Sequence, residues 1–189
     1  GPSIALGGGE VRMIDMAQAF GVLSNQGIKV PLVPILKVEN YKKDILEEVD
    51  FDERLENLKD LQEDEYSSKL GNLERVMDAA PAYLTSHIMQ DNTARVLAFG
   101  SHSELVIPGQ VVSAKTGTTN DLKDNWTIGF TPEFLTISWV GNNDNTSMSY
   151  VASGVTGAAP IFNDIMSYIL QEQEPIWQDK PESVIKGPI

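Results

Sequence analysis

The stretch that decides the fold is Ser113-Ala114-Lys115-Thr116-Gly117-Thr118-Thr119-Asn120-Asp121. Two valines, Val111 and Val112, precede it, and residues 110–115 are predicted to form an apolar strand that ends at Lys115. A lysine beside hydroxyls and free backbone N–H groups can receive a carboxylate or an oxyanion. Taken alone, the same residues also suit a strand end with a solvated lysine and a polar turn.

Alternation along a strand divides the side chains of this stretch between two faces. One face would carry Lys115, Gly117 and Thr119, and the other would carry Thr116 and Thr118. Gly117 has no Cβ, so another backbone or a ligand could approach closely there.

Residues 109–116 are also a near miss to the phosphate-binding loop G-x-x-x-x-G-K-[ST]. Ala114 replaces the second glycine, and the two valines suit a strand better than a loop. Residues 117–121 are a poor helix start, whereas the phosphate loop needs a helix there to present its N–H groups. A helix beginning at Lys115 would favour the phosphate loop, and a strand would exclude it.

Two further strands are predicted downstream. Residues 125–131 alternate through Trp126, Ile128 and Phe130, and residues 134–140 show a similar alternation. The short turn Thr131-Pro132-Glu133 separates them, so they are predicted to pair as an antiparallel hairpin.

Helices are predicted on both sides of these strands. The first carries an apolar stripe at helical spacing and is stopped by Gly27; the stripe is Met13, Met16, Ala17, Phe20 and Leu23. Pro81 at a first helical position opens a helix to Gln90, and a short helix over residues 92–99 ends at Gly100. A last helix covers residues 157–170, with Ile161, Ile165, Tyr168 and Ile169 on one side. Residues 32–38, which include Pro34, are expected to be extended.

Composition narrows the possible functions of this 189-residue chain. A net charge of −13 argues against binding nucleic acid through a basic surface. Because cysteine is absent and only His87 and His102 are present, no metal site and no cofactor are expected. No run of residues reaches the roughly 18–20 apolar positions that a membrane span needs.

Most of the charge excess lies in residues 39–78, which hold 14 acidic and 6 basic residues. An apolar stripe of Phe51, Leu55, Leu58 and Leu61 predicts a peripheral helix within residues 50–65. We interpret residues 42–75 as an acidic surface insertion; the alternative is a docking face for a protein partner.

Several segments then match one family in order and spacing. After Lys115-Thr116-Gly117-Thr118-Thr119-Asn120-Asp121 come Asp124, Trp126, Gly129-Phe130-Thr131-Pro132 and Trp139-Val140-Gly141. This succession resembles the transpeptidase domain of bifunctional (class A) penicillin-binding proteins. Flanking segments extend the resemblance over most of the chain: Leu6-Gly7-Gly8-Gly9-Glu10-Val11, Asp15-Met16-Ala17-Gln18-Ala19-Phe20, Asn25-Gln26-Gly27 and Gly157-Ala158-Ala159-Pro160-Ile161-Phe162.

The resemblance implies an α+β fold: an antiparallel sheet flanked by helices, as in penicillin-binding protein transpeptidases and serine β-lactamases. It implies that residues 1–189 are the C-terminal part of one transpeptidase domain, with residues 171–189 as a tail. Of the family's three motifs, S-x-x-K, S-x-N and K-T-G, only K-T-G has its expected context. Ser183-Val184-Ile185-Lys186 fits S-x-x-K but lies on the wrong side of K-T-G, so we interpret it as a coincidence.

The resemblance also implies roles for the K-T-G residues. Lys115 would supply positive potential and orient the S-x-N serine. The Thr116 and Thr118 hydroxyls would bind the carboxylate of a D-Ala-D-Ala stem or of a β-lactam, and the Thr118 backbone N–H would form half of an oxyanion hole. Gly117 would let substrate lie against the strand, with Thr119 beside it. Asp124 and Trp126 would hold the turn behind the site.

The function implied is peptidoglycan D,D-transpeptidation through an acyl-serine intermediate, with stem peptides and β-lactams as ligands. A D,D-carboxypeptidase or serine β-lactamase is the alternative within the fold, and a non-catalytic envelope module is the alternative outside it. The T-T-N-D and G-F-T-P segments favour the transpeptidase. The missing upstream part of the domain would supply the serine, so the chain alone is expected to be inactive. The family implies the outer face of the bacterial cytoplasmic membrane, with an anchor and a glycosyltransferase region outside this sequence.

Some residues depart from the family pattern or are weaker candidates. Ser113-Ala114 replaces the common A-G and could narrow the site slightly. Arg12 replaces a helix-capping threonine and cannot accept the capping hydrogen bond, which should affect stability alone. His87 is expected on a helix surface or in packing, and His102 in a loop. Residues 142–145 are expected to form a turn, because a calcium loop needs a glycine and a closing glutamate that are absent.

Overall fold

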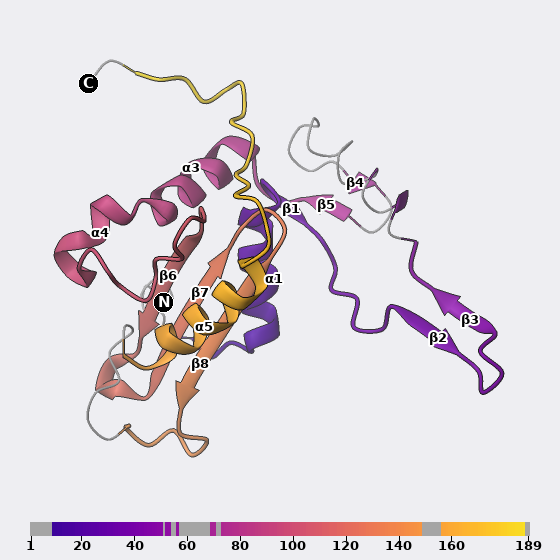
Figure 1. The fold of residues 1–189 in the computed structure, drawn as a ribbon, viewed down its shortest axis with the longest axis horizontal. Coiled ribbons are helices and arrows are strands. Elements are labelled where there is room, and N and C mark those ends of the chain that lie inside the picture. Colours follow the sequence, from indigo (N-terminus) through magenta and orange to yellow (C-terminus); the bar gives the residue numbers. More distant parts are fainter. Residues whose placement is uncertain are drawn as a thin grey trace.

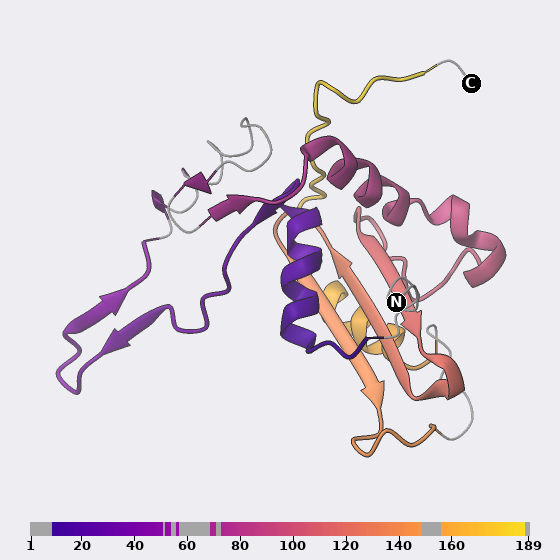
Figure 2. The ribbon, with the colours of Figure 1, turned by 180° about the vertical axis from the view of Figure 1, so that it is seen from behind.

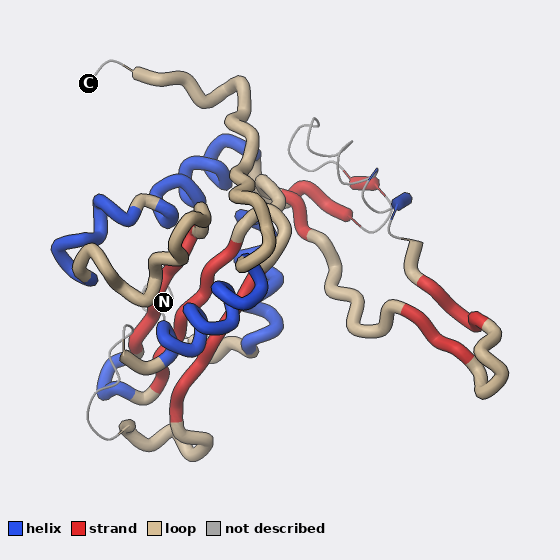
Figure 3. Tube along the Cα trace, viewed as in Figure 1, coloured by secondary structure: helices blue, strands red, loops and turns tan. Residues whose placement is uncertain are grey.

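The K-T-G strand forms one edge of a three-stranded antiparallel sheet. The computed structural model describes residues 9–50, 52–53, 56, 69–70, 73–148 and 156–187. The sheet contains β6 (Ser113–Thr118), β7 (Asp124–Phe130) and β8 (Leu135–Gly141), in that order (Figures 1 and 3). Phe130 pairs with Leu135 across the hairpin, so the predicted hairpin and the α+β class are confirmed.

The bounds of β6 differ from the prediction. Lys115 lies in the middle of the strand, and the ladder with β7 continues to the pair Thr118 and Asn125. The predicted start at Gln110 is wrong because the side chain of Gln110 donates to the carbonyl oxygens of Leu170 (3.1 Å) and Gln173 (2.7 Å). These bonds tie residue 110 to the end of a helix instead of the sheet. A strand at Lys115 also excludes the phosphate loop.

Helices cover both faces of the sheet, as Figure 2 shows from behind. On one face lie α1 (Met13–Ser24) and α3 (Ala79–Gln90), and on the other lies α5 (Ala158–Leu170). The ring of Phe20 on α1 meets Phe130 edge-on at a centroid distance of 6.4 Å. The shorter α4 (Asn92–Phe99) follows α3, and Gly100 ends it with a positive φ of 76°.

The main core lies between α5 and the sheet. It consists of Leu105, Ile107, Val112, Ala114, Ala159, Phe162, Met166 and Leu170. The apolar side of α5 predicted from the spacing is wrong for Ile161, which is 46% exposed, and for Tyr168, which is 74% exposed; Ile169 does pack against the core. A Cβ on Gly129 would come within 2.5 Å of the Phe162 ring. Because residue 129 has no side chain, the Phe162 ring can fill that space. The face of α5 that carries alanine and phenylalanine therefore packs on the sheet.

Gly27 ends α1 as predicted, together with the residue before it. Gln26 and Gly27 both have positive φ, 50° and 95°, and their N–H groups donate to the carbonyls of Leu23 and Val22. This is the pattern of a Schellman cap. A Cβ on Gly27 would lie 2.0 Å from the Met77 carbonyl oxygen, so no larger residue fits there.

The chain then enters a second small sheet. It contains β1 (Ile28–Lys29), β5 (Leu73–Arg75) and β4 (Lys69–Leu70), in that order. Leu73 and Arg75 are buried, and the Arg75 guanidinium donates to the Gln26 carbonyl at 2.8 Å. The last residues of the expected insertion therefore pair with β1 and are buried, while the insertion itself stays a prediction.

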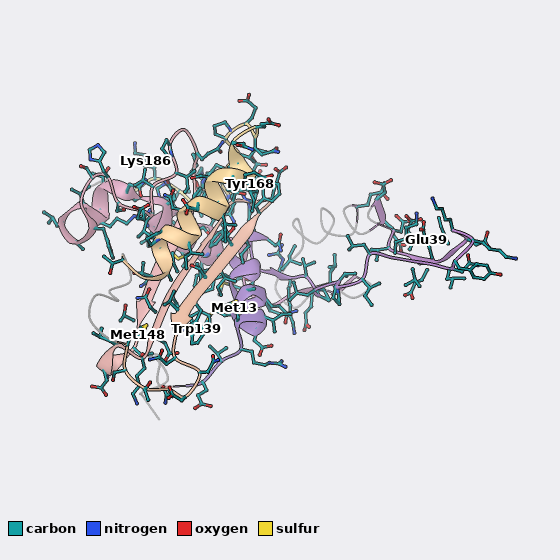
Figure 4. The ribbon with its side chains drawn as sticks, turned by 60° about the horizontal axis from the view of Figure 1, so that its bottom comes forward. Met13, Glu39, Trp139, Met148, Tyr168 and Lys186 are labelled. Atoms are coloured by element: carbon teal, nitrogen blue, oxygen red, sulfur yellow. The ribbon has the colours of Figure 1, made fainter. Side chains whose placement is uncertain are left out.

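Between these strands, β2 (Lys37–Glu39) and β3 (Ile45–Glu48) form a hairpin that projects from the body (Figure 1). Figure 4 shows Glu39 on this projection, well away from Met13 and Trp139. The helix expected from Phe51, Leu55, Leu58 and Leu61 lies outside the described residues and stays a prediction. The alternative, that these residues form a docking face for a protein partner, also stays a prediction.

Two other details differ from expectation. Helix α3 begins at Ala79, two residues before Pro81, and so places the proline inside its first turn. The tail is packed along part of its length: the Gln178 amide donates to the carbonyls of Leu23 (2.7 Å) and Ser24 (2.8 Å) at the end of α1. In the described part of the chain, the helices are too short or too polar to cross a membrane.

The close approach of α5 to β7 predicts opposite effects for two glycine-to-alanine changes. Gly129→Ala should lower the free energy of unfolding by about 1–3 kcal/mol, because the new methyl group overlaps the Phe162 ring. Gly21→Ala lies in α1 with open space around it and should raise that free energy by about 0.5–1 kcal/mol. Urea unfolding of the two variants measures both. Equal effects would contradict the packing of α5 described above.

Candidate functional site

The K-T-G side chains divide between the two faces of β6 as alternation predicts. Lys115 stands opposite Ile128, and Gly117 stands opposite Trp126. Thr116 and Thr118 stand opposite Thr127 and Asn125, on the face that α5 covers. Lys115, Gly117 and Thr118 are exposed, and Thr116 is partly buried. The motif therefore presents a cation, an open glycine and a hydroxyl to solvent.

The outer edge of β6 carries backbone groups that face away from β7. Arg95 Nη1 donates to the Ala114 carbonyl at 2.9 Å, and Lys115 Nζ donates to the Thr116 carbonyl. In an antiparallel strand, alternate residues turn both backbone groups to the same side. Thr118 belongs with Ala114 and Thr116, so its N–H lies along the outer edge. In the described part of the chain, no further strand covers this edge.

Arg95 on α4 anchors the strand just before Lys115. Its guanidinium also donates to the Met89 carbonyl (2.9 Å) and to the Asn92 side chain (2.9 Å), so one arginine joins α3, α4 and β6. Burial lowers the pKa of Arg95, and the negative charge of Asp91 opposes that effect. No local pattern in the sequence points to Arg95, since its contact with Ala114 spans 19 positions of the chain.

The two residues before Lys115 do not narrow the site. Ser113 is fully buried and its hydroxyl donates to the Ser86 carbonyl at 2.7 Å. Ala114 is buried in the core cluster. The expectation of a narrower site is wrong because both side chains pack inward, where they fix β6 against α3 and the core.

Thr119 and Asp124 close the turn between β6 and β7. The Asp124 N–H donates to Thr119 Oγ1 at 2.8 Å, and the Thr119 N–H donates to the Asp124 carbonyl at 3.0 Å. Trp139 Nε1 donates to Asp124 Oδ1 at 2.9 Å. Asp124 therefore holds the turn as expected, and Trp126 packs against Trp139 at a ring distance of 6.4 Å. The Thr119 hydroxyl also donates to Asp124 Oδ2 at 3.3 Å, so Thr119 bonds within the turn, and its direct contact with substrate stays a prediction.

The weaker candidates lie in ordinary surroundings. His87 is exposed on α3 beside Tyr83, and His102 is exposed in a loop beside Ser101. The Asn145 N–H donates to the Asn142 carbonyl, so the expected turn is confirmed. The Thr146 hydroxyl lowers the pKa of Asp144 through a hydrogen bond. Within the described ranges, no three histidine, aspartate or glutamate residues lie close enough together to hold a metal ion.

The S-x-x-K coincidence lies in the tail. Ser183 is exposed in a turn closed by the Val184 N–H and the Pro181 carbonyl. Figure 4 shows Lys186 at the far end of the body from Met148. The Met148 backbone donates to Leu122 in the β6–β7 turn at 3.0 Å.

Arg12 takes the first capping position of α1 without a capping bond, as expected. Its guanidinium instead pairs with Asp15 through bonds of 2.7 and 2.9 Å. This pairing lowers the pKa of the Asp15 carboxyl.

Comparison with known proteins agrees with the fold and with the family resemblance. Residues 3–167 match the family model "Penicillin binding protein transpeptidase domain". Penicillin-binding protein 1A of Rickettsia bellii is 31% identical over 186 residues, which are 96% of this chain and 23% of that protein. The protein of the same name from a serogroup A Neisseria meningitidis is 31% identical over 187 residues, covering 98% of this chain and 21% of that one.

Solved structures give the same result for the fold. Penicillin-binding protein 1A from Haemophilus influenzae superimposes with a TM-score of 0.78 at 21% identity, over 96% of this chain and 30% of that one. PonA1 from Mycobacterium tuberculosis, in complex with penicillin V, gives 0.69 at 23% identity, over 96% and 44%. The chain belongs to the penicillin-binding protein transpeptidase family. It spans about a fifth of the length of the penicillin-binding proteins 1A quoted above.

The anchoring of β6 predicts that Arg95 and Arg12 contribute differently to the stability of the protein. Arg95→Met keeps the aliphatic stem and loses the hydrogen bonds to Ala114, Met89 and Asn92. The free energy of unfolding should therefore fall by about 1.5–3 kcal/mol. Arg12→Met removes a solvent-exposed pair and should leave the melting temperature within error. Thermal unfolding of both variants beside the parent protein decides this. A larger effect at Arg12 would contradict the anchoring role.

Proposed function

We propose that this chain supplies the K-T-G side of the acyl-transfer site of a peptidoglycan D,D-transpeptidase. The observation that carries the proposal is the edge of β6, which no strand covers in the described part of the chain and along which Lys115, Gly117 and Thr118 are exposed. The remaining catalytic groups, a nucleophilic serine with its lysine and the S-x-N serine, would come from the upstream part of the same domain, outside this sequence.

The chemistry of the donor substrate fits this edge. A stem peptide that ends in D-Ala-D-Ala is extended and carries a terminal carboxylate. An extended peptide can pair with an exposed strand edge through main-chain hydrogen bonds. Lys115 supplies positive potential, and the Thr116 and Thr118 hydroxyls donate to the carboxylate. Gly117 lets the peptide backbone lie close to the strand, since a side chain there would hold it away.

The reaction then proceeds in two balanced steps. The serine Oγ attacks the carbonyl carbon between the two D-alanines, the C–N bond breaks, and the departing D-alanine amine takes the hydroxyl proton. The amine of a second stem next attacks the acyl carbon, the C–O bond to the serine breaks, and the serine oxygen takes a proton from that amine as the cross-link forms. The outward N–H of Thr118 stabilises the oxyanion in both steps, together with the N–H of the nucleophile.

A β-lactam would enter as a mimic of the same donor, since it offers a strained amide and a carboxylate. Transfer of the acyl group to water instead would make the protein a D,D-carboxypeptidase or a β-lactamase. A non-catalytic envelope module would bind stem peptides without an acyl intermediate. The substrate polymer lies outside the cytoplasmic membrane, so we place the protein on its outer face, held there by an anchor in another part of the protein.

The first consequence concerns the chain by itself. After incubation with penicillin, intact-mass spectrometry should show the unmodified mass, because the nucleophilic serine of the proposed site would come from the upstream part of the domain, outside this sequence. The S-x-x-K serine Ser183 lies in the tail. A stoichiometric adduct on Ser183 or on any other serine of the chain would overturn the assignment of the nucleophile.

The second consequence concerns the full-length protein. Lys115→Ala should slow its acylation by a fluorescent penicillin by about 10²–10³-fold, as groups at oxyanion sites typically do. Lys186→Ala, which removes the lysine of the tail motif, is the matched control and should leave the rate unchanged. Absence of any adduct on the parent protein would sink the transpeptidase proposal and favour a binding module.

A further inference from the structure

A buried asparagine lies directly behind the exposed hydroxyl of the K-T-G strand. Asn125 on β7 is fully buried and pairs with Thr118 across the sheet. Its Nδ2 donates to Thr118 Oγ1 at 3.2 Å, and its Oδ1 accepts the backbone N–H of Ala158 at 2.7 Å. The side chain therefore connects the first residue of α5 to the threonine hydroxyl.

The orientation of the Asn125 amide follows from its partners. The Ala158 N–H can only donate, so the amide oxygen must face it and the NH₂ group must face Thr118. Gly157 makes room for this bond, because a Cβ there would lie 2.6 Å from Oδ1. The chain passes this close to the amide oxygen only because residue 157 is glycine.

The hydrogen bond from Asn125 determines whether the Thr118 hydroxyl can donate to a ligand on the solvent side. A hydroxyl has one hydrogen to donate and two lone pairs to accept with. Because Asn125 occupies a lone pair, the hydrogen of Thr118 stays available to the solvent side. A carboxylate can only accept hydrogen bonds, so it needs a hydroxyl in this state.

We propose that Asn125 is a positioning residue that presents the Thr118 hydroxyl as a hydrogen-bond donor to the carboxylate of the incoming substrate or β-lactam. Asn125 acts through Thr118 and does not touch the ligand itself. The inference rests on the proposed function, since that function supplies the carboxylate.

The test is acylation of the full-length protein by a fluorescent penicillin, measured as a second-order rate constant. Asn125→Asp keeps the shape and the bond to Ala158 but replaces the donor by an acceptor, so the Thr118 hydroxyl turns inward. We expect a loss of about 10–100-fold, the size of a hydrogen bond to a charged group. Asn125→Ala leaves the hydroxyl free to turn either way and should lose about 3–10-fold, the size of one neutral hydrogen bond.

The comparison of the two rate constants distinguishes a positioning role of Asn125 from a purely structural one. If Asn125 were only structural, the isosteric aspartate should be tolerated at least as well as the truncation to alanine. The folded fraction of each variant, measured by circular dichroism under the labelling conditions, corrects the rate constant for any unfolded protein. Rates for aspartate equal to or faster than those for alanine would overturn the inference.

A second pair of variants tests the route through Thr118. In a Thr118→Val background there is no hydroxyl to orient, so adding Asn125→Ala should change the rate constant by less than about twofold, within the additivity error for independent sites. A full Asn125→Ala penalty in that background would contradict the inference. An unlabelled parent protein would instead refute the proposed function, whereas a labelled parent with unchanged Asn125 variants would refute this inference alone.

Discussion

The register between β6 and β7 is the constraint on which the rest of the structure depends. It sets Lys115 opposite Ile128 and Thr118 opposite Asn125. A slip of one residue would exchange the two faces of the strand, because side chains alternate with a period of two. Ala114 would then leave the core, and the lysine would point under α5. Burial of Ala114 and of Ser113 on opposite faces holds the strand in this register from both sides.

The layers on each face keep the edge of β6 in place, and among the described residues no strand covers it. Phe162 of α5 packs against the backbone of β7 at Gly129. On the other face, the Ser86 carbonyl of α3 accepts a hydrogen bond from the Ser113 hydroxyl. Arg95 joins both neighbouring helices to the carbonyl just before Lys115. A receptor for a carboxylate gains from such support, because groups that are already in place need no reorganisation when charge arrives.

Much of this arrangement could be predicted from the sequence where the signal was local. The hairpin, the two helices before β6 and the cap at Gly27 follow from alternation, periodicity and special backbone positions. The errors occurred where tertiary contacts decide. Val111 and Val112 resemble a strand, yet the bonds of Gln110 hold this segment against the end of α5. The packing face of α5 depends on Gly129 of β7, which has no side chain and lies more than 25 positions before the helix. Arg95 and Asn125 gave no signal because their roles depend on which residues the register places beside them.

The polar residues beneath α5 show how the core contributes to the site. Burying an amide or a hydroxyl is unfavourable unless it is hydrogen-bonded. Here Ser138 on β8 donates to the Ala158 carbonyl at 2.7 Å, while Asn125 on β7 accepts the N–H of the same residue. The start of α5 is thus held by two neighbouring strands at once. The same bonds fix the amide that faces Thr118, so the position of a helix on one side of the sheet is transmitted to a hydroxyl at its edge. An apolar core of equal volume would hold the layers together as well, but it could not orient that hydroxyl.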